Sequence, residues 1–172
     1  IATQNHYGSA GTQALPDSQL DRFMVRLSIG YPGRDSQVAI LKSRRGVSDI
    51  DNVRPMMTRD DVKEIQDYLF SIKITEDILY YITDLCTETR RAAMVEQGVS
   101  PRGIHALAQL VRARAILRER DFVTPEDVRA VFFDVCAHRL VMKPQAKIEG
   151  VTAADVLQDI LAKVKAPSLG RK

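Results

Sequence analysis

A helix-start signal recurs along the second part of the chain and constrains its fold more than any other feature. Three times, a threonine stands three residues before an aspartate and directly ahead of an apolar helical pattern. The pairs are Thr58 with Asp61, Thr124 with Asp127, and Thr152 with Asp155. In this capping box the threonine hydroxyl accepts a backbone N–H, and the acid favours the positive end of the helix. Each cap is worth about 1 kcal/mol, so the pattern predicts a mainly helical domain.

Apolar residues follow these caps at spacings of three and four, which is typical of helices that bury one face. Ser100 followed by Pro101 is a further helix start, because proline is favoured at the first helical position. We predict helices that begin at Thr58, Thr75, Ser100, Thr124 and Thr152, the last running to about Lys165, and an earlier helix between Asp35 and Arg45.

The N-terminal part has a different pattern. Residues 1–5 are expected to form a strand that ends in a polar tip, and residues 17–23 a short helix with Asp17 as its N-cap. Residues 24–30 are expected to form a second strand, closed by Gly30. We therefore predict a strand–helix–strand remnant followed by helices only.

The expected division is 1–33 for this remnant, 34–57 for a helix and connector, and 58–172 for the helical domain. Two strands do not make a stable domain by themselves. Because the chain also opens abruptly at Ile1, we expect it to be a fragment of a larger protein.

Composition excludes several classes of protein. Apolar residues make up 45% of the chain and Trp is absent, so we expect an aliphatic core. The formal charge of +3 is small and spread along the chain, which makes a nucleic-acid partner unlikely. No apolar run approaches the roughly 20 residues of a membrane-spanning helix. Cys86 and Cys136 are expected to be reduced core thiols, and no metal site is expected.

Three polar residues are candidates for function: Asn5, Arg22 and Arg102. Each also has an ordinary structural interpretation. Asn5 could satisfy turn amides at a strand end, Arg22 could pair with Asp21 at the surface, and Arg102 could be solvated in a first helical turn. A cation is mildly disfavoured in that turn, which is a reason to look for an anion beside it. Arg26 is a second candidate for the functional arginine of this segment, after Arg22.

Taken together and in order, several motifs resemble the second half of a MoxR-type AAA+ ATPase. They are Asn5, Leu20-Asp21-Arg22-Phe23, Gly30-Tyr31-Pro32, Ser100-Pro101-Arg102, Ala137-His138-Arg139-Leu140 and Gly150-Val151-Thr152-Ala153-Ala154-Asp155-Val156. The resemblance implies a mainly α fold, in which a helical AAA+ lid domain follows a remnant of the α/β P-loop NTPase core.

The same resemblance implies roles for the three candidates. Asn5 matches sensor 1, which holds the attacking water, Arg22 matches the arginine finger, and Arg102 matches sensor 2 in the lid. The cofactors implied are ATP and Mg²⁺. The implied assembly is a homo-oligomeric ring, expected to be a hexamer, in the cytoplasm. Chaperone-like remodelling or metal insertion is the implied work, with a von Willebrand A-type protein as a possible client by family resemblance.

The sequence also departs from that family. The residue after Asn5 is His6 rather than Pro, and neither a glycine-loop lysine motif nor an acidic strand end is found. The chain alone is therefore expected to be inactive. The alternative is a helical module that binds protein or nucleic acid, with the basic helix 102–120 as its recognition element. In that helix the arginines are expected to form an exposed charged face: Arg112, Arg114, Arg118 and Arg120.

Overall fold

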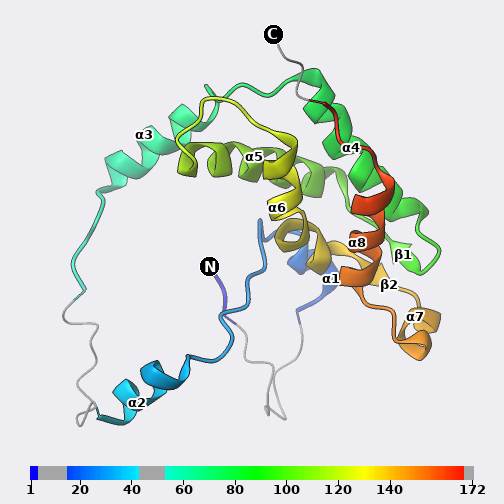
Figure 1. Cartoon of the computed structure of the whole chain (residues 1–172), viewed down its shortest axis with the longest axis horizontal. Helices are drawn as coiled ribbons and strands as arrows, with labels where there is room; N and C mark the ends of the chain where they lie inside the picture. The colour runs from blue at the N-terminus through cyan, green and yellow to red at the C-terminus, as the bar shows by residue number, and fades with distance from the viewer. Residues whose placement is uncertain (4–14, 43–52, 169–172) are drawn as a thin grey trace.

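The computed structural model describes residues 1–3, 15–42 and 53–168 of the chain. In chain order its elements are α1 (Asp17–Leu20), α2 (Arg34–Lys42), α3 (Arg59–Leu69), α4 (Glu76–Arg91), β1 (Val95–Gln97), α5 (Pro101–Leu117), α6 (Pro125–Cys136), the 3-10 helix η2 (Ala137–Arg139), β2 (Val141–Met142), α7 (Pro144–Glu149) and α8 (Ala153–Lys163). Figure 1 shows α4, α5, α6 and α8 gathered into one body, with α2 lying well away from it. The described part is thus mainly helical, as predicted.

The predicted helix starts are confirmed. All three capping boxes are present, before α3, α6 and α8, and in each the aspartate accepts the backbone N–H of its threonine at 2.8–2.9 Å. Ser100 caps α5, with Pro101 as the first helical residue. Gly150 ends α7 in the left-handed region, with φ 72°, a conformation that glycine adopts without strain. That turn leads directly into the cap of α8.

The core lies between the apolar faces of α4, α5, α6 and α8. Phe132, Leu85 and Leu107 are among its fully buried side chains, and the core is largely aliphatic, as expected. Cys86 and Cys136 are free, buried thiols within it. Burial raises the pKa of Cys136 well above its usual value, and the neighbouring Cys86 adds to the shift. Both cysteines therefore act as small apolar residues in this core.

Two small elements were not predicted. β1 and β2 form an antiparallel pair with Val95 opposite Met142, so the expectation that no strand follows residue 30 is wrong. Strands of two and three residues are too short to show an alternating pattern. α7 was also missed, since six residues hold less than two helical turns.

The N-terminal part departs most from expectation. Residues 24–30 have no strand assignment, so the predicted second strand is wrong. Their backbone is bound by α6, where the carbonyl of Asp134 accepts the N–H of Arg26, and by η2, where Arg139 donates to the carbonyl of Met24. α1 covers only Asp17–Leu20 and is followed by a turn, rather than extending to residue 23.

Other parts of those predictions lie partly outside the described residues. Residues 1–3 have no strand assignment, and residues 4 and 5 are not described. The helix expected from Asp35 is present as α2, while its predicted end at Arg45 lies outside the description. Neither α2 nor α3 buries a residue. No helix of the described ranges has the length and apolar character needed to cross a membrane.

Candidate functional site

The segment 20–26 lies against the end of α6 and η2, and side chains alternate along it. Asp21, Phe23 and Val25 are partly buried, whereas Arg22 and Met24 are exposed. Figure 1 shows α1, which leads into this segment, beside the lower end of the helical body. Partly buried and exposed side chains thus alternate through this turn, and the Arg22 side chain lies on its solvent-exposed side.

Arg139 of η2 holds the segment in place. Its side chain is only 1% exposed, and its Nε donates to the carboxylate of Asp21 at 3.1 Å. The two terminal nitrogens donate to four backbone carbonyls: those of Asp21 (3.2 Å), Phe23 (2.5 Å), Met24 (3.1 Å) and Val135. A guanidinium has five N–H donors in a rigid fork, so every donor of this buried cation has an oxygen acceptor.

Asp21 also contacts the start of α5. The hydroxyl of Ser100 lies 3.0 Å from each carboxylate oxygen of Asp21 and donates to them. The same hydroxyl accepts the backbone N–H of Gly103 at 3.2 Å, which caps α5. A hydroxyl both donates and accepts, so Ser100 joins the 20–26 segment to the helix that carries Arg102. We call Asp21, Ser100 and Arg139 the Arg139 cluster.

Gly103 makes room for this cluster. A Cβ at this position would lie 2.9 Å from Cδ of Arg139 and 2.5 Å from Cγ1 of Val99. Both distances are too short for ordinary contact. The absence of a side chain therefore lets the Arg139 stem pass across the first turn of α5.

The loop before Ser100 is fixed from the other side by α4. The backbone N–H of Val99 donates to the hydroxyl of Thr89 at 2.9 Å, and Nε of Arg90 donates to the carbonyl of Val99 at 2.8 Å. Thr89 in turn donates to the carbonyl of Cys86. The start of α5 is therefore held by α4 and by the Arg139 cluster together.

Arg22 and Arg102 are close neighbours, in the chain, of residues of the Arg139 cluster. Arg22 directly follows Asp21, and Arg102 lies two residues after Ser100. Both side chains are exposed, and neither has a hydrogen bond or ion pair within the described ranges. The alternative interpretation of Arg22, a surface pair with Asp21, does not hold, because Asp21 pairs with Arg139. An exposed guanidinium without a partner suits a phosphate group.

Two further candidates from the sequence are Asn5 and Arg26. Asn5 lies outside the described residues. Arg26 is exposed, and its backbone N–H donates to the carbonyl of Asp134 at 2.9 Å, which anchors the far end of the segment.

His138 has a structural place beside Arg139. Its Nε2 lies 3.1 Å from the carbonyl of Phe23. A terminal nitrogen of Arg139 also lies 3.0 Å from this Nε2. Burial lowers the pKa of His138 below its ordinary value, although the carbonyl of Phe23 opposes the shift. The ring is therefore neutral at neutral pH and supports the segment without acting as an acid.

The arginines of α5 and the following turn do not form the predicted exposed face. Arg120 binds the buried carboxylate of Asp127 at 2.7 Å, and Arg114 lies 3.5 Å from it. Arg112 is half-buried, and only Arg118 of the set is exposed. Burial raises the pKa of Asp127, but its bonds to Arg120 and to the cap lower it further, so the net pKa is below the ordinary value. The buried acid thus hydrogen-bonds one arginine and lies within ion-pair distance of a second, both of which the sequence alone left unpaired.

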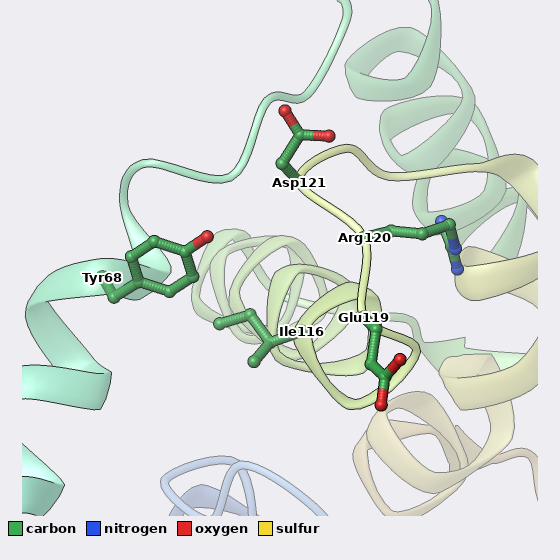
Figure 2. Close-up of a pocket in the computed structure, with 5 residues that line it drawn as sticks. All are labelled: Tyr68, Ile116, Glu119, Arg120 and Asp121. Atoms are coloured by element: carbon green, nitrogen blue, oxygen red, sulfur yellow. The ribbon is translucent and has the colours of Figure 1, made fainter.

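A surface hollow lies at the other end of α5. Figure 2 shows the residues that line it, from α3, the end of α5 and the turn that follows: Tyr68, Ile116, Glu119, Arg120 and Asp121. At 1.5 Å per residue, its Ile116 is about 20 Å along the helix from Arg102. The Arg120 guanidinium binds Asp127, so the hollow offers no unpaired cation for a phosphate.

Sequence reasoning missed the three residues that organise the site. Arg139 was noted only within a motif, Ser100 also as a helix start, and Asp21 within a motif and as an alternative partner for Arg22. The contacts join residues 79 and 118 positions apart, which no periodicity can show. The one available signal was Gly103, a helix-weakening residue in a first turn.

The AAA lid domain family matches residues 87–160. The uncharacterized protein YeaC of Bacillus subtilis is 34% identical over 97% of this chain and 52% of its own length. Chaperone MoxR1 of Mycobacterium tuberculosis is 28% identical over 98% of this chain and 47% of its own. A crystal structure of a protein assigned as an ATPase, from Cytophaga hutchinsonii, superposes with a TM-score of 0.85 at 28% identity, covering 96% of this chain and 53% of the other. The chain thus spans about half the length of the relatives it matches.

Proposed function

We propose, since the chain belongs to the MoxR family of AAA+ proteins, that it supplies the arginine finger and the lid sensor of a ring-forming ATPase. Arg22 is the proposed finger and Arg102 the proposed sensor. One observation carries the proposal: two exposed guanidiniums, without a partner in the described ranges, stand on elements that the contact of Ser100 with Asp21 joins.

The chemistry fits the phosphates of ATP. Arg22 would stabilise charge on the transferring phosphoryl group, a role worth about 10³–10⁵ in rate in well-studied NTPases. Arg102 stands in the first turn of α5, where the helix dipole also favours an anion. Asn5 would hold the attacking water, since an amide both donates and accepts without carrying charge.

The ligands of Mg²⁺ are proposed to come from outside this chain. Mg²⁺ prefers carboxylate oxygens, waters and phosphates, and the described ranges contain no cluster of three acidic, histidine or cysteine side chains. The sequence also lacks a glycine-loop lysine motif. We expect the chain alone to bind ATP weakly or not at all. Calorimetric titration of ATP into the 172-residue chain checks this, and a low-micromolar affinity would contradict it.

The proposed assembly is a homo-oligomeric ring, and the proposed number of subunits is six. Arg22 is exposed and binds no group in the described part of its own lid, so its proposed target is the nucleotide of a neighbouring subunit. The proposed division is 1–33 for the end of the α/β core, 34–57 for a connector, and 58–172 for the lid. One relative carries the name chaperone, which supports the proposal of chaperone-like remodelling. The cytoplasm is the proposed location from the family resemblance. Metal insertion and a von Willebrand A-type client are further proposals from the family resemblance.

Substitution of Arg22 in the full-length protein tests the proposal. Arg22→Ala is expected to lower kcat by about 10³ or more, while the affinity for an ATP analogue stays within about twofold. Arg118→Ala, which removes an exposed arginine at the end of α5, is the matched control and should leave kcat unchanged. Turnover that survives in Arg22→Ala would refute the finger assignment.

Mixed rings separate a finger that acts on the neighbour from one that acts in its own subunit. One subunit type carries Arg22→Ala, and the other carries a disabled nucleotide pocket with Arg22 intact. Active mixed rings are expected, because each interface that joins an intact finger to an intact pocket works. Mixed rings without turnover would contradict action across the interface.

A further inference from the structure

Arg139 lies where the segment that carries Arg22 meets the start of the helix that carries Arg102. Four of its five acceptors belong to Asp21, Phe23 and Met24, which surround Arg22 in the chain. The fifth is the carbonyl of Val135 near the end of α6. The guanidinium therefore fixes the backbone on both sides of Arg22 to the end of that helix.

The contact is specific for arginine. Lysine carries three N–H donors on a single nitrogen. It therefore cannot donate to all five oxygen acceptors that surround the planar guanidinium group. Gly103 also leaves room for this stem, since a Cβ there would lie 2.9 Å from Cδ of Arg139 and 3.2 Å from its Nε. Both the head and the stem of Arg139 are thus matched to their surroundings.

A second link runs from the same cluster to Arg102. Asp21 accepts from both Arg139 and Ser100, and Ser100 caps the helix that carries Arg102. Any shift of the start of α5 toward or away from a phosphate on Arg102 would therefore move Asp21 and the Arg22 backbone with it.

We propose that Arg139 is a positioning residue for Arg22, and that through Asp21 and Ser100 it makes the finger and the lid sensor move as one unit. The inference rests on the proposed function, since it gives Arg139 no contact with nucleotide. It adds a way for the lid of one subunit to set the reach of the finger toward the next. A residue needed only for folding would have no such selective effect on turnover.

The test is a double-mutant cycle in the full-length protein, with Arg22→Ala, Arg139→Lys and the double variant. Because a misplacement of about 1 Å can cost 10²-fold in rate, Arg139→Lys is expected to lower kcat by about tenfold to hundredfold. Its affinity for an ATP analogue should stay within about twofold, because the loop that precedes α5 stays bound to α4 through Val99. The double variant should be no slower than Arg22→Ala alone, since a residue that acts only through Arg22 has nothing left to position.

Each outcome decides one claim. If Arg22→Ala slows turnover and Arg139→Lys does not, or if the two losses add, the positioning role is overturned and the finger assignment stands. If Arg22→Ala leaves turnover intact, the proposed function fails and the positioning role fails with it. Loss of nucleotide affinity in Arg139→Lys together with a lowered melting temperature would assign Arg139 a folding role and also overturn the inference.

Asp21→Asn supplies a second variant that leaves the core untouched, since the Asp21 side chain is 25% exposed. It keeps an oxygen for Nε of Arg139 and removes the charge that compensates the guanidinium. We expect a smaller loss of kcat than in Arg139→Lys, again without further loss in the Arg22→Ala background. Arg118→Lys is the control for an arginine-to-lysine change on an exposed helix end, and it should leave kcat unchanged.

Discussion

The helical body and the segment that carries Arg22 are held in place by different interactions. In the body, α4, α5, α6 and α8 share a core with many fully buried apolar side chains. The segment 20–26 packs Val25 partly against that core, but its backbone is bound by Arg139, His138 and the end of α6. The free energy of burying apolar side chains scales with the buried area and depends little on the exact arrangement of the atoms. The five hydrogen bonds of a guanidinium, by contrast, require each acceptor to lie at the right distance and angle.

This difference indicates that the body determines the stability of the fold, while the polar contacts of the segment determine the position of Arg22. A body stabilised by its core tolerates changes at its surface. A segment bound mainly through polar groups can be released while the body stays folded. The four predictions below test this separation, from the largest expected effect to the smallest.

Truncation of the core should have the largest effect on unfolding. Phe132 is 0% exposed and packs edge-to-face against Phe133 at 6.3 Å. Phe132→Ala in the 172-residue chain is expected to lower the free energy of unfolding by about 3–5 kcal/mol. Leu117→Ala, at a side chain 83% exposed, should change it by less than about 0.5 kcal/mol. Urea unfolding measures both, and equal effects would mean that the body is not held by its core.

The buried ion pair of the body should come second. Asp127 is 3% exposed and Arg120 is 26% exposed, so Arg120 could regain water after Asp127→Ala. We expect a loss of about 2–3 kcal/mol, somewhat less than for a fully buried pair, and about 1 kcal/mol of it comes from the capping box with Thr124 that the same substitution removes. Asp121→Ala, which breaks a pair exposed on both sides, should cost less than about 0.5 kcal/mol. A similar loss in both variants would show that burial does not set the strength of these pairs.

The effect of His138 on the pH dependence of stability should be smaller than the effects of these two substitutions. Burial lowers its pKa below 6.5 in the folded chain, so the unfolded chain binds the proton more tightly. Stability is then complete above pH 6.5 and declines as the pH falls toward the lowered pKa. Arg139 and Arg26 lower this pKa as well, while Asp21 raises it.

Urea midpoints at several pH values between 8 and about 5 measure this effect. His138→Gln is expected to flatten the decline, and His105→Gln, at an exposed position of α5, should retain it. A decline that is unchanged in His138→Gln would assign the effect to another group.

The two proposed functional arginines should have the smallest effect on unfolding. Arg22→Ala and Arg102→Ala remove exposed side chains without partners in the described ranges. Each should change the free energy of unfolding by less than about 0.5 kcal/mol. A loss above 1 kcal/mol in either urea experiment would mean that the residue stabilises the fold.

The same contrast explains what the sequence could predict. Helix starts such as Thr124 and Ser100 follow from neighbours within three residues, and the structure confirms them. The short β1–β2 pair carried too few residues to show a period. The strand predicted over residues 24–30 failed because alternation shows which residues face inward, not what they face.

The candidate site divides in the same way. Arg22 and Arg102 were found from short motifs, whereas the Arg139 cluster joins residues that are far apart in sequence. Arg114 and Arg120 were mispredicted as exposed because their partner Asp127 was explained fully by its capping box. An aspartate at a cap can still accept from an arginine, and local patterns do not reveal the second contact.

Hydrogen exchange of the 172-residue chain tests the central claim most directly, by comparing the wild type with Arg139→Lys. The amides of Phe23 and Arg26, which donate to the carbonyls of Leu20 and Asp134, report on the segment, and those of α4, α5 and α6 report on the body. We expect exchange in the segment to rise by about tenfold or more, as for a local opening, while the body keeps its protection. Unchanged protection in the segment, or an equal loss across the whole body, would contradict the claim that Arg139 holds Arg22 on the lid.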